Sequence, residues 1–299
     1  MTKKTIQTLG VASSIGGPSE TCDQGPLVLE KSDFNKLFSS DNERLSLHWH
    51  DPLVVNSTEK NSLKLLKKQS FYVGQFCQKQ LEDENSFLIL GGDHSTAVGT
   101  WGGVLNGLPL EASFALVWID AHMDAHTLES SLSGNLHGMP VSLLLGEAEH
   151  ELQKCFPSPH ALDGRDLYLF GIRSYESDEL ILLSEQKVNV FDTGRIERDG
   201  GTTKVLTKLI ETISRCYDYY AISLDLDAID PKDAPGVETR EEGGLTAENL
   251  LKAFNGISFG DDFVGLEIAE FDPDHDENQK TEKLVFDIVN SIYSNHDTT

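Results

Sequence analysis

Residues 112–124 read ASFALVWIDAHMD, an apolar run that leads directly into Asp120, His122 and Asp124. Short, continuous apolar runs bounded by turn residues are typical of strands that are buried on both faces of a parallel sheet. This stretch therefore predicts a buried strand whose carboxyl end carries two carboxylates and an imidazole.

Further apolar runs recur along the chain, and segments of helical character separate them. The other runs cover residues 86–90, 167–170, 188–191, 219–224 and 263–269, and the helical candidates cover residues 62–80, 141–145, 204–216 and 247–254. In the third candidate, apolar side chains fall at the i, i+3, i+4, i+7 spacing of one buried helix face, at Val205, Leu206, Leu209, Ile210 and Ile213. Alternating strands and helices predict an α/β fold with a central, mostly parallel sheet that helices cover on both sides.

The chain has 299 residues, enough for one large α/β domain or for two ordinary ones. It contains no internal repeat and no low-complexity linker. The stretch richest in loop-forming residues, 230–244, follows a strand candidate and lies between the motif segments. We therefore expect residues 1–299 to form a single domain.

Composition excludes several classes of protein. The 49 acidic and 24 basic residues give a formal charge of −25, which repels nucleic acid and anionic lipid. No apolar run approaches the ~20 residues that span a bilayer, and the N-terminus lacks the apolar core of a signal peptide. The four cysteines lie far apart and in no C-x-x-C spacing, so free thiols are the simplest interpretation. We expect a cytoplasmic protein that binds neither nucleic acid nor membrane.

Side chains that can ligate metal ions gather at the ends of the apolar runs. In open α/β sheets, ligands bind in the crevice beyond the carboxyl ends of the strands. Residues expected at this rim are His94, Asp120, His122, Asp124, Asp225, Asp227 and Glu270. Within a strand-end segment, residues i and i+2 point the same way, so Asp225 and Asp227 should share one side while Leu226 faces the core.

The six residues before Glu270 in this set supply four carboxylates and two imidazoles, which is too much negative charge to stay together without cations. Two divalent ions would neutralise them. Oxygen and nitrogen ligands without thiolate fit manganese, with iron, cobalt or nickel as substitutes. A single aspartate after a strand is most often a cap or turn residue, but independent caps have no reason to repeat Asp-x-Asp and Asp-x-His-x-Asp. Two neighbouring ions can activate a shared water, so the set predicts metal-assisted hydrolysis.

These motifs resemble the ureohydrolases, and the arginases in particular. The segments that carry the resemblance are GGDHS at 91–95, DAHMD at 120–124, SGNLHG at 133–138, SLDLDAIDP at 223–231 and EIAEFDP at 267–273. They run in family order over most of the chain, from the region of Gly25 and Pro26 to Pro273.

The resemblance implies a three-layer α/β/α fold with two Mn²⁺ ions per chain. It implies hydrolysis of L-arginine to L-ornithine and urea, through attack of a metal-bridging hydroxide on the guanidinium carbon. One ion would be held by His94, Asp120, Asp124 and Asp225, and the other by His122, Asp120, Asp225 and Asp227. The family also suggests a homo-oligomer, a trimer or a hexamer.

The resemblance further assigns catalytic roles to three residues. His137 matches a histidine that shuttles protons, and its ordinary pKa near 6.5 suits that task. Glu270 matches a carboxylate that pairs with the substrate guanidinium, whose planar fork suits such a partner. Asp124 would orient the hydroxide.

The resemblance also places residues around the amino acid head group of a substrate. Ser133 and Asn135 match residues that hold the substrate carboxylate, and Glu176 matches an acidic residue that contacts the substrate ammonium. His126 stands where arginases commonly carry an asparagine that also touches the carboxylate. Thr239 keeps the position of a threonine in the binding loop.

Residues 234–240, APGVETR, differ from the usual Thr-Gly-Thr-Pro type of loop, and their APGV resembles formimidoylglutamase. A related ureohydrolase acting on formimidoylglutamate, guanidinobutyrate or agmatine is thus an alternative. A metal-dependent deacetylase would normally use one zinc ion and would not need both bridging aspartates. A non-catalytic family member would not need the complete ligand set.

Overall fold

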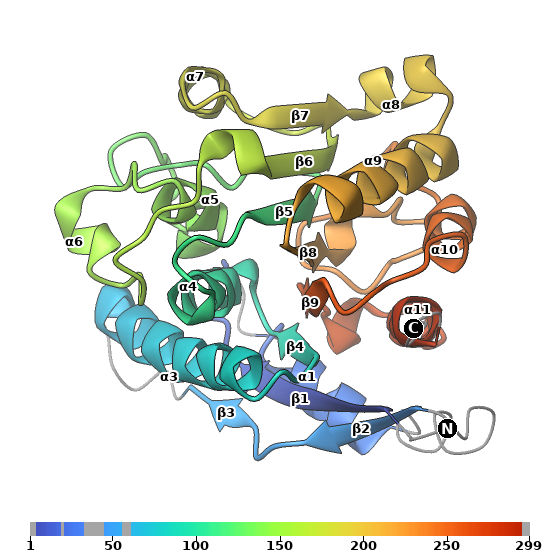
Figure 1. The fold of residues 1–299 in the computed structure, drawn as a ribbon, viewed down its shortest axis with the longest axis horizontal. Coiled ribbons are helices and arrows are strands. Elements are labelled where there is room, and N and C mark those ends of the chain that lie inside the picture. The colour runs from blue at the N-terminus through green and yellow to red at the C-terminus, as the bar shows by residue number, and fades with distance from the viewer. Residues whose placement is uncertain (1–3, 19–20, 33–44, 56–60, 295–299) are drawn as a thin grey trace.

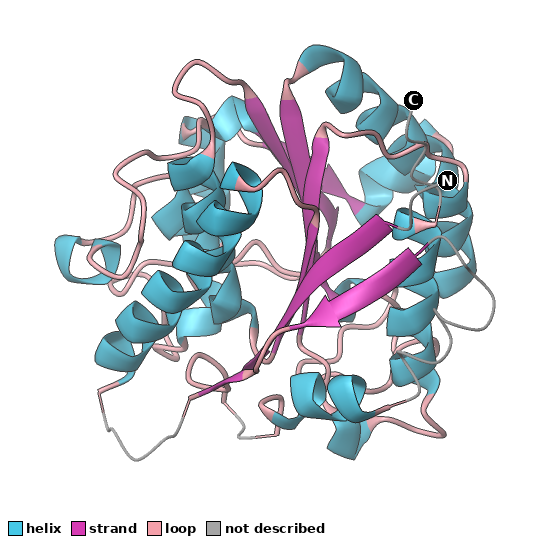
Figure 2. Cartoon of the chain, turned by 60° about the horizontal axis from the view of Figure 1, so that its bottom comes forward, coloured by secondary structure: helices cyan, strands magenta, loops and turns pink. Residues whose placement is uncertain are grey.

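The chain forms one nine-stranded sheet between two layers of helices (Figures 1 and 2). The structure is a computed structural model that describes residues 4–18, 21–32, 45–55 and 61–294. None of the helices in these ranges is long and apolar enough to cross a membrane. The predicted α/β fold class is confirmed.

The sheet has the order β2-β1-β4-β9-β8-β5-β6-β7, with β3 paired to β1. Every pairing between these strands is parallel. The strands are β1 (Lys4–Ala12), β2 (Leu45–Trp49), β3 (Leu53–Val54), β4 (Phe87–Gly91), β5 (Phe114–Ile119), β6 (Leu167–Ile172), β7 (Asn189–Asp192), β8 (Tyr219–Asp225) and β9 (Phe263–Ala269). All six apolar runs of the sequence are strands of this sheet, whereas β1, β2 and β3 were not among the predicted strands.

The helices divide between the two faces of the sheet. They are α1 (Gln24–Lys31), α3 (Ser62–Glu82), α4 (Ala97–Gly107), α5 (Pro140–Leu144), α6 (His150–Gln153), α7 (Ser177–Glu185), α8 (Thr193–Asp199), α9 (Thr202–Cys216), α10 (Ala247–Asn255) and α11 (Lys280–Tyr293). Helices α3 to α7 pack into one apolar core and α1 and α8 to α11 into the other. Figure 2 shows the sheet edge-on with helices on either side.

Helix α9 shows how the apolar pattern determines which face is buried. Val205, Leu206, Ile210 and Ile213 are buried, and Leu209 is partly buried against the same core. The predicted helix face is therefore confirmed. The helix begins two residues earlier than the pattern indicated, directly after Gly201.

Helix α4 was missed because its sequence, AVGTWGGVLNG, is poor in helix-forming residues. Its glycines instead permit close contact with α3. A Cβ at Gly103 would lie 2.3 Å from the carbonyl oxygen of Gly74 on α3. Tertiary packing thus outweighs local propensity here.

We expect Ile210→Ala to lower the free energy of unfolding by about 2–5 kcal/mol, because it leaves a cavity in a fully buried site on α9. Lys208→Ala, on the exposed side of the same helix, should change it by less than about 0.5 kcal/mol. Urea denaturation followed by circular dichroism measures both, and equal effects would contradict the assignment of the buried face.

Candidate functional site

Four neighbouring strands at the centre of the sheet carry the site at their carboxyl ends. The order β4-β9-β8-β5 places four segments side by side. His94 follows β4 by three residues, Glu270 follows β9, Asp225 ends β8 and Asp120 follows β5. Residues that are far apart in the sequence therefore meet at one rim because their strands are adjacent and parallel.

Three carboxylates surround the first imidazole. The Nδ1 atom of His94 lies 3.2 Å from Asp120 Oδ2, 3.2 Å from Asp124 Oδ2 and 3.1 Å from Asp225 Oδ2. His94 is 1% exposed. This group contains the four residues expected to hold the first metal ion.

A second group lies against the first and shares Asp120 with it. His122 Nδ1 lies 3.0 Å from Asp227 Oδ2 and 3.6 Å from Asp120 Oδ1. The other ring nitrogen, Nε2, lies 3.7 Å from Glu241 Oε1, a neighbour that the sequence did not indicate. Asp120 therefore offers one oxygen to each imidazole. Asp225, also expected to bridge, lies in the first group and uses its Oδ1 to accept a hydrogen bond from the backbone N–H of Asp227.

Hydrogen bonds behind His94 determine which ring nitrogen faces the carboxylates. Its Nε2 lies 3.0 Å from Ser223 Oγ, and that oxygen also accepts the indole N–H of Trp101 and donates to Glu267. Because the single hydroxyl proton of Ser223 goes to Glu267, His94 Nε2 must donate. In the neutral ring, Nδ1 then presents a lone pair, as in a histidine that ligates a metal ion.

The charges of the cluster call for cations. Burial, followed by the charges of Asp227 and Asp120, raises the pKa of Asp225 well above its ordinary value. Burial and the charge of Asp120 raise the pKa of Asp124 to about 6. His94 Nδ1 is buried and, within the described part of the chain, makes no hydrogen bond of good geometry. A lone pair among three buried carboxylate oxygens fits a divalent metal ion.

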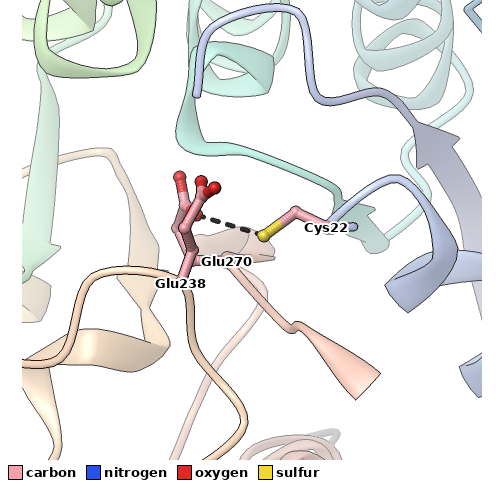
Figure 3. A group of neighbouring side chains, drawn as sticks. All are labelled: Cys22, Glu238 and Glu270. Atoms are coloured by element: carbon pink, nitrogen blue, oxygen red, sulfur yellow. Dashed lines mark hydrogen bonds between the residues drawn. The ribbon is translucent and has the colours of Figure 1, made fainter. Parts of the chain in front are cut away.

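Glu270 connects this cluster to His137. The Oε1 atom of Glu270 lies 3.1 Å from His137 Nδ1 and accepts the backbone N–H of His94. On the other side, the thiol of Cys22 donates to Glu270 Oε2, and the carboxylate of Glu238 lies close to both (Figure 3). Burial opposes a charge on His137, but Glu270 outweighs it and raises the pKa of His137 to about 9.

A pocket of about 190 Å³ opens beside the cluster. Ten of the predicted site residues line it, namely His122, Asp124, His126, Ser133, Asn135, His137, Glu176, Asp225, Asp227 and Thr239. The other three, His94, Asp120 and Glu270, are at most 3% exposed. The structure thus brings the predicted ligands together and sets the predicted head-group residues around the same pocket.

Of the predicted head-group residues, Thr239 lies on the loop that precedes α10, and the other four lie on two further loops of the pocket wall. Ser133 and Asn135 lie on one, where the backbone N–H of Asn135 donates to Ser133 Oγ. His126 faces the other loop, with Nε2 at 2.9 Å from Glu176 Oε2 and 3.5 Å from Glu179 Oε2. His126 therefore contacts the acidic residues directly.

Several residues of this region were not among the predicted site residues, and for three of them the sequence carries a signal. Ser223 and Glu267 lie inside the quoted motifs SLDLDAIDP and EIAEFDP, and both are buried. A polar residue inside an apolar run that leads to a ligand is the pattern that could have indicated them. Glu179 stands three residues after Glu176, which is the spacing of a helix capping box, and that motif begins α7.

Two site residues adopt left-handed backbone conformations. The φ angles are 49° at Asp124 and 68° at Glu270. Backbone hydrogen bonds hold both, from the N–H of Val141 to the carbonyl of Asp124 and from the N–H of Glu270 to the carbonyl of Gly92. Strained conformations of this kind concentrate at functional sites.

Known proteins are similar to this chain in sequence and in fold over nearly its whole length. A family model described as the arginase family matches residues 5–294. The arginase of Bacillus caldovelox is 33% identical over 97% of this chain and 98% of the relative. A solved structure of the arginase of that organism superimposes with a TM-score of 0.87, at 26% identity and over 99% of this chain and 100% of that one.

The arginase of Bacillus subtilis gives a similar result. Its crystal structure has a TM-score of 0.84 and 29% identity, and covers 97% of this chain and 98% of that one. The family model, the curated relatives and the solved structures lead to one conclusion: the chain belongs to the arginase family of metal-dependent amidinohydrolases.

Proposed function

We propose that this protein hydrolyses L-arginine to L-ornithine and urea with two Mn²⁺ ions. The observation that carries the proposal is the pair of ligand groups that share Asp120 at the edge of a pocket. The remaining walls of that pocket offer polar side chains suited to an amino acid. Family membership and the arginases among the relatives support the same substrate.

Six side chains would hold the ions. His94, Asp120, Asp124 and Asp225 form the first set, and His122, Asp120, Asp225 and Asp227 the second. When bound, two divalent ions neutralise the carboxylates and supply Lewis-acid activation of water. Among the chain's own groups, Asp124 has a carboxylate that both lines the pocket and contacts His94, so it would orient the attacking water.

Glu270 would position the guanidinium group. Burial disfavours charge on this carboxylate, but His137 outweighs that effect and lowers the pKa of Glu270, so it is ionised at neutral pH. A buried, ionised carboxylate attracts a planar cation that donates several hydrogen bonds. Glu270 would thereby hold the guanidinium carbon near the metal ligands.

His137 would supply the proton that the reaction requires. The bond between the guanidinium carbon and the side-chain nitrogen of the substrate breaks, and that nitrogen leaves as the amine of ornithine after it gains a proton. His137 lines the pocket and carries a proton at neutral pH because of Glu270. It is therefore the general acid of this proposal.

The head group of the substrate would lie at the outer wall. Ser133 and Asn135 would donate to its carboxylate, and Glu176 would accept from its ammonium group, with His126 and Thr239 completing the wall. Assembly into trimers or hexamers and a cytoplasmic location are expectations that accompany this proposal.

A substrate panel tests the function. We expect the Mn²⁺-loaded protein to release urea from L-arginine with a kcat/KM at least about tenfold above those for agmatine and guanidinobutyrate, because neither offers the complete head group. Formimidoylglutamate should release no formamide. A preference for any of the other three substrates would overturn the assignment to arginine.

Within the same assay, Glu270→Gln should lower kcat/KM for arginine by about 10²–10³-fold, since it removes a buried charge partner of the substrate. Glu248→Gln, an exposed position on α10, is the matched control and should not change the rate.

Metal binding should stabilise the fold. We expect the melting temperature of EDTA-treated protein to rise with added Mn²⁺, because an ion at about 100 times its Kd adds about 2.7 kcal/mol per site. Asp120→Asn, which removes the ligand common to both groups, should abolish most of this rise. The exposed control Asp261→Asn should retain it, and an equal response of the two variants would contradict the assigned ligands.

The raised pKa of His137 predicts a pH-dependent stability of the metal-free protein. The pKa of His137 is about 9 in the folded chain and 6.5 in the unfolded chain, because the protonated imidazole is stabilised by Glu270. This contribution to the free energy of unfolding is fully present below pH 6.5 and is lost as the pH rises through about 9. The difference in melting temperature between wild type and His137→Asn should therefore be largest below pH 6.5 and shrink above pH 9. A difference that stays constant from pH 6 to pH 10 would exclude the His137–Glu270 pair.

A further inference from the structure

The outer wall of the pocket contains a second group of metal-ligand side chains, formed by His126, Glu176 and Glu179. One ligand atom from each residue lies within 4.8 Å of the other two. None of the three belongs to the six ligands of the two-metal cluster. They line the same pocket, and the 62% exposed side chain of Glu176 places the group at the pocket mouth.

The positions of Glu179 and Glu176 are fixed by the start of α7. The carboxylate of Glu179 is only 3% exposed, and its two oxygens accept backbone N–H groups of Ala125 and Glu176 at 3.0 Å. The first bond attaches the helix to the ligand loop that follows β5. Glu179 therefore cannot turn away from His126 without breaking two backbone hydrogen bonds.

The ring of His126 is oriented in a similar way. Its Nδ1 lies 3.0 Å from Ser130 Oγ, an oxygen that also accepts the backbone N–H of Thr127. This contact leaves Nε2 directed at the two carboxylates. An imidazole whose second nitrogen is held by a hydrogen bond is the usual arrangement of a histidine that ligates a metal ion.

We propose that His126, Glu176 and Glu179 bind a third divalent transition-metal ion at the pocket mouth. One imidazole and two carboxylates are a donor set that Zn²⁺ and Co²⁺ accept, and three protein ligands leave a coordination position open toward the pocket. The ion takes the place of the proton that His126 Nε2 otherwise donates to Glu176. Because the proposed function places Glu176 and His126 at the substrate head group, the ion and the substrate ammonium would compete for Glu176, and metal binding is therefore measured without substrate.

Counting ions per chain tests this site. Wild type, His126→Asn and the control His160→Asn are dialysed against a Zn²⁺ series, and bound zinc is measured by inductively coupled plasma mass spectrometry. His160 is an exposed histidine on the loop before residue 164. Wild type and His160→Asn should each bind one more Zn²⁺ per chain than His126→Asn, and equal counts in all three would overturn the site.

A second variant guards against misfolding of the first. Glu176→Gln changes an exposed side chain and should weaken the Kd of the additional ion at least tenfold, while its circular dichroism matches that of wild type. An unchanged Kd would overturn the site even if His126→Asn failed to fold. Urea release is not measured in this test. If the protein hydrolyses arginine but wild type and both histidine variants bind equal numbers of Zn²⁺ ions, the result excludes only the third ion. If wild type binds the additional Zn²⁺ ion but the Mn²⁺-loaded protein releases no urea from arginine, the result excludes only the proposed function.

Discussion

Mutual repulsion among buried carboxylates is the constraint on which the rest of this site depends. Asp120, Asp124, Asp225 and Asp227 are at most 6% exposed and lie around two imidazoles. Two such charges 4 Å apart repel each other by about 4 kcal/mol at the effective dielectric of a protein site. The rim can hold them only where cations or donated protons offset that energy, so bound metal ions would supply a large part of the charge balance that the site requires.

The parallel sheet meets part of this requirement through its backbone. Backbone N–H groups in the ligand segments donate to the side chains of Asp93, Asp120 and Asp225, at Ser95, His122 and Asp227 respectively. Such bonds favour the ionised form of a carboxylate. The centre of the sheet therefore both gathers the acids and orients them, while the two apolar cores keep its strands in register.

The sequence predicted the strands that are buried throughout, because continuous apolar runs such as residues 114–119 have one simple interpretation. It missed β1, whose KTIQTLGVA mixes polar and apolar residues, and α4, whose glycines serve close packing rather than propensity. The sequence placed the six predicted ligands at one rim of the sheet, but it did not give the order of the strands. The order β4-β9-β8-β5 in the folded sheet is what makes the ligand segments neighbours. Contacts such as Glu238 with Cys22 join segments too distant for any pattern to pair, and the roles of the site residues stay predictions.

The left-handed backbone at Asp124 and Glu270 limits which residues these positions can accept. Aspartate tolerates this conformation better than most residues, whereas glutamate has no such advantage. Glycine would relax the chain at either position but would remove the carboxylate, and other side chains would keep the strain without supplying the charge. At both positions the fold therefore accepts a strained backbone in order to keep a carboxylate in the site. The surrounding hydrogen bonds hold a conformation that the residue itself does not prefer.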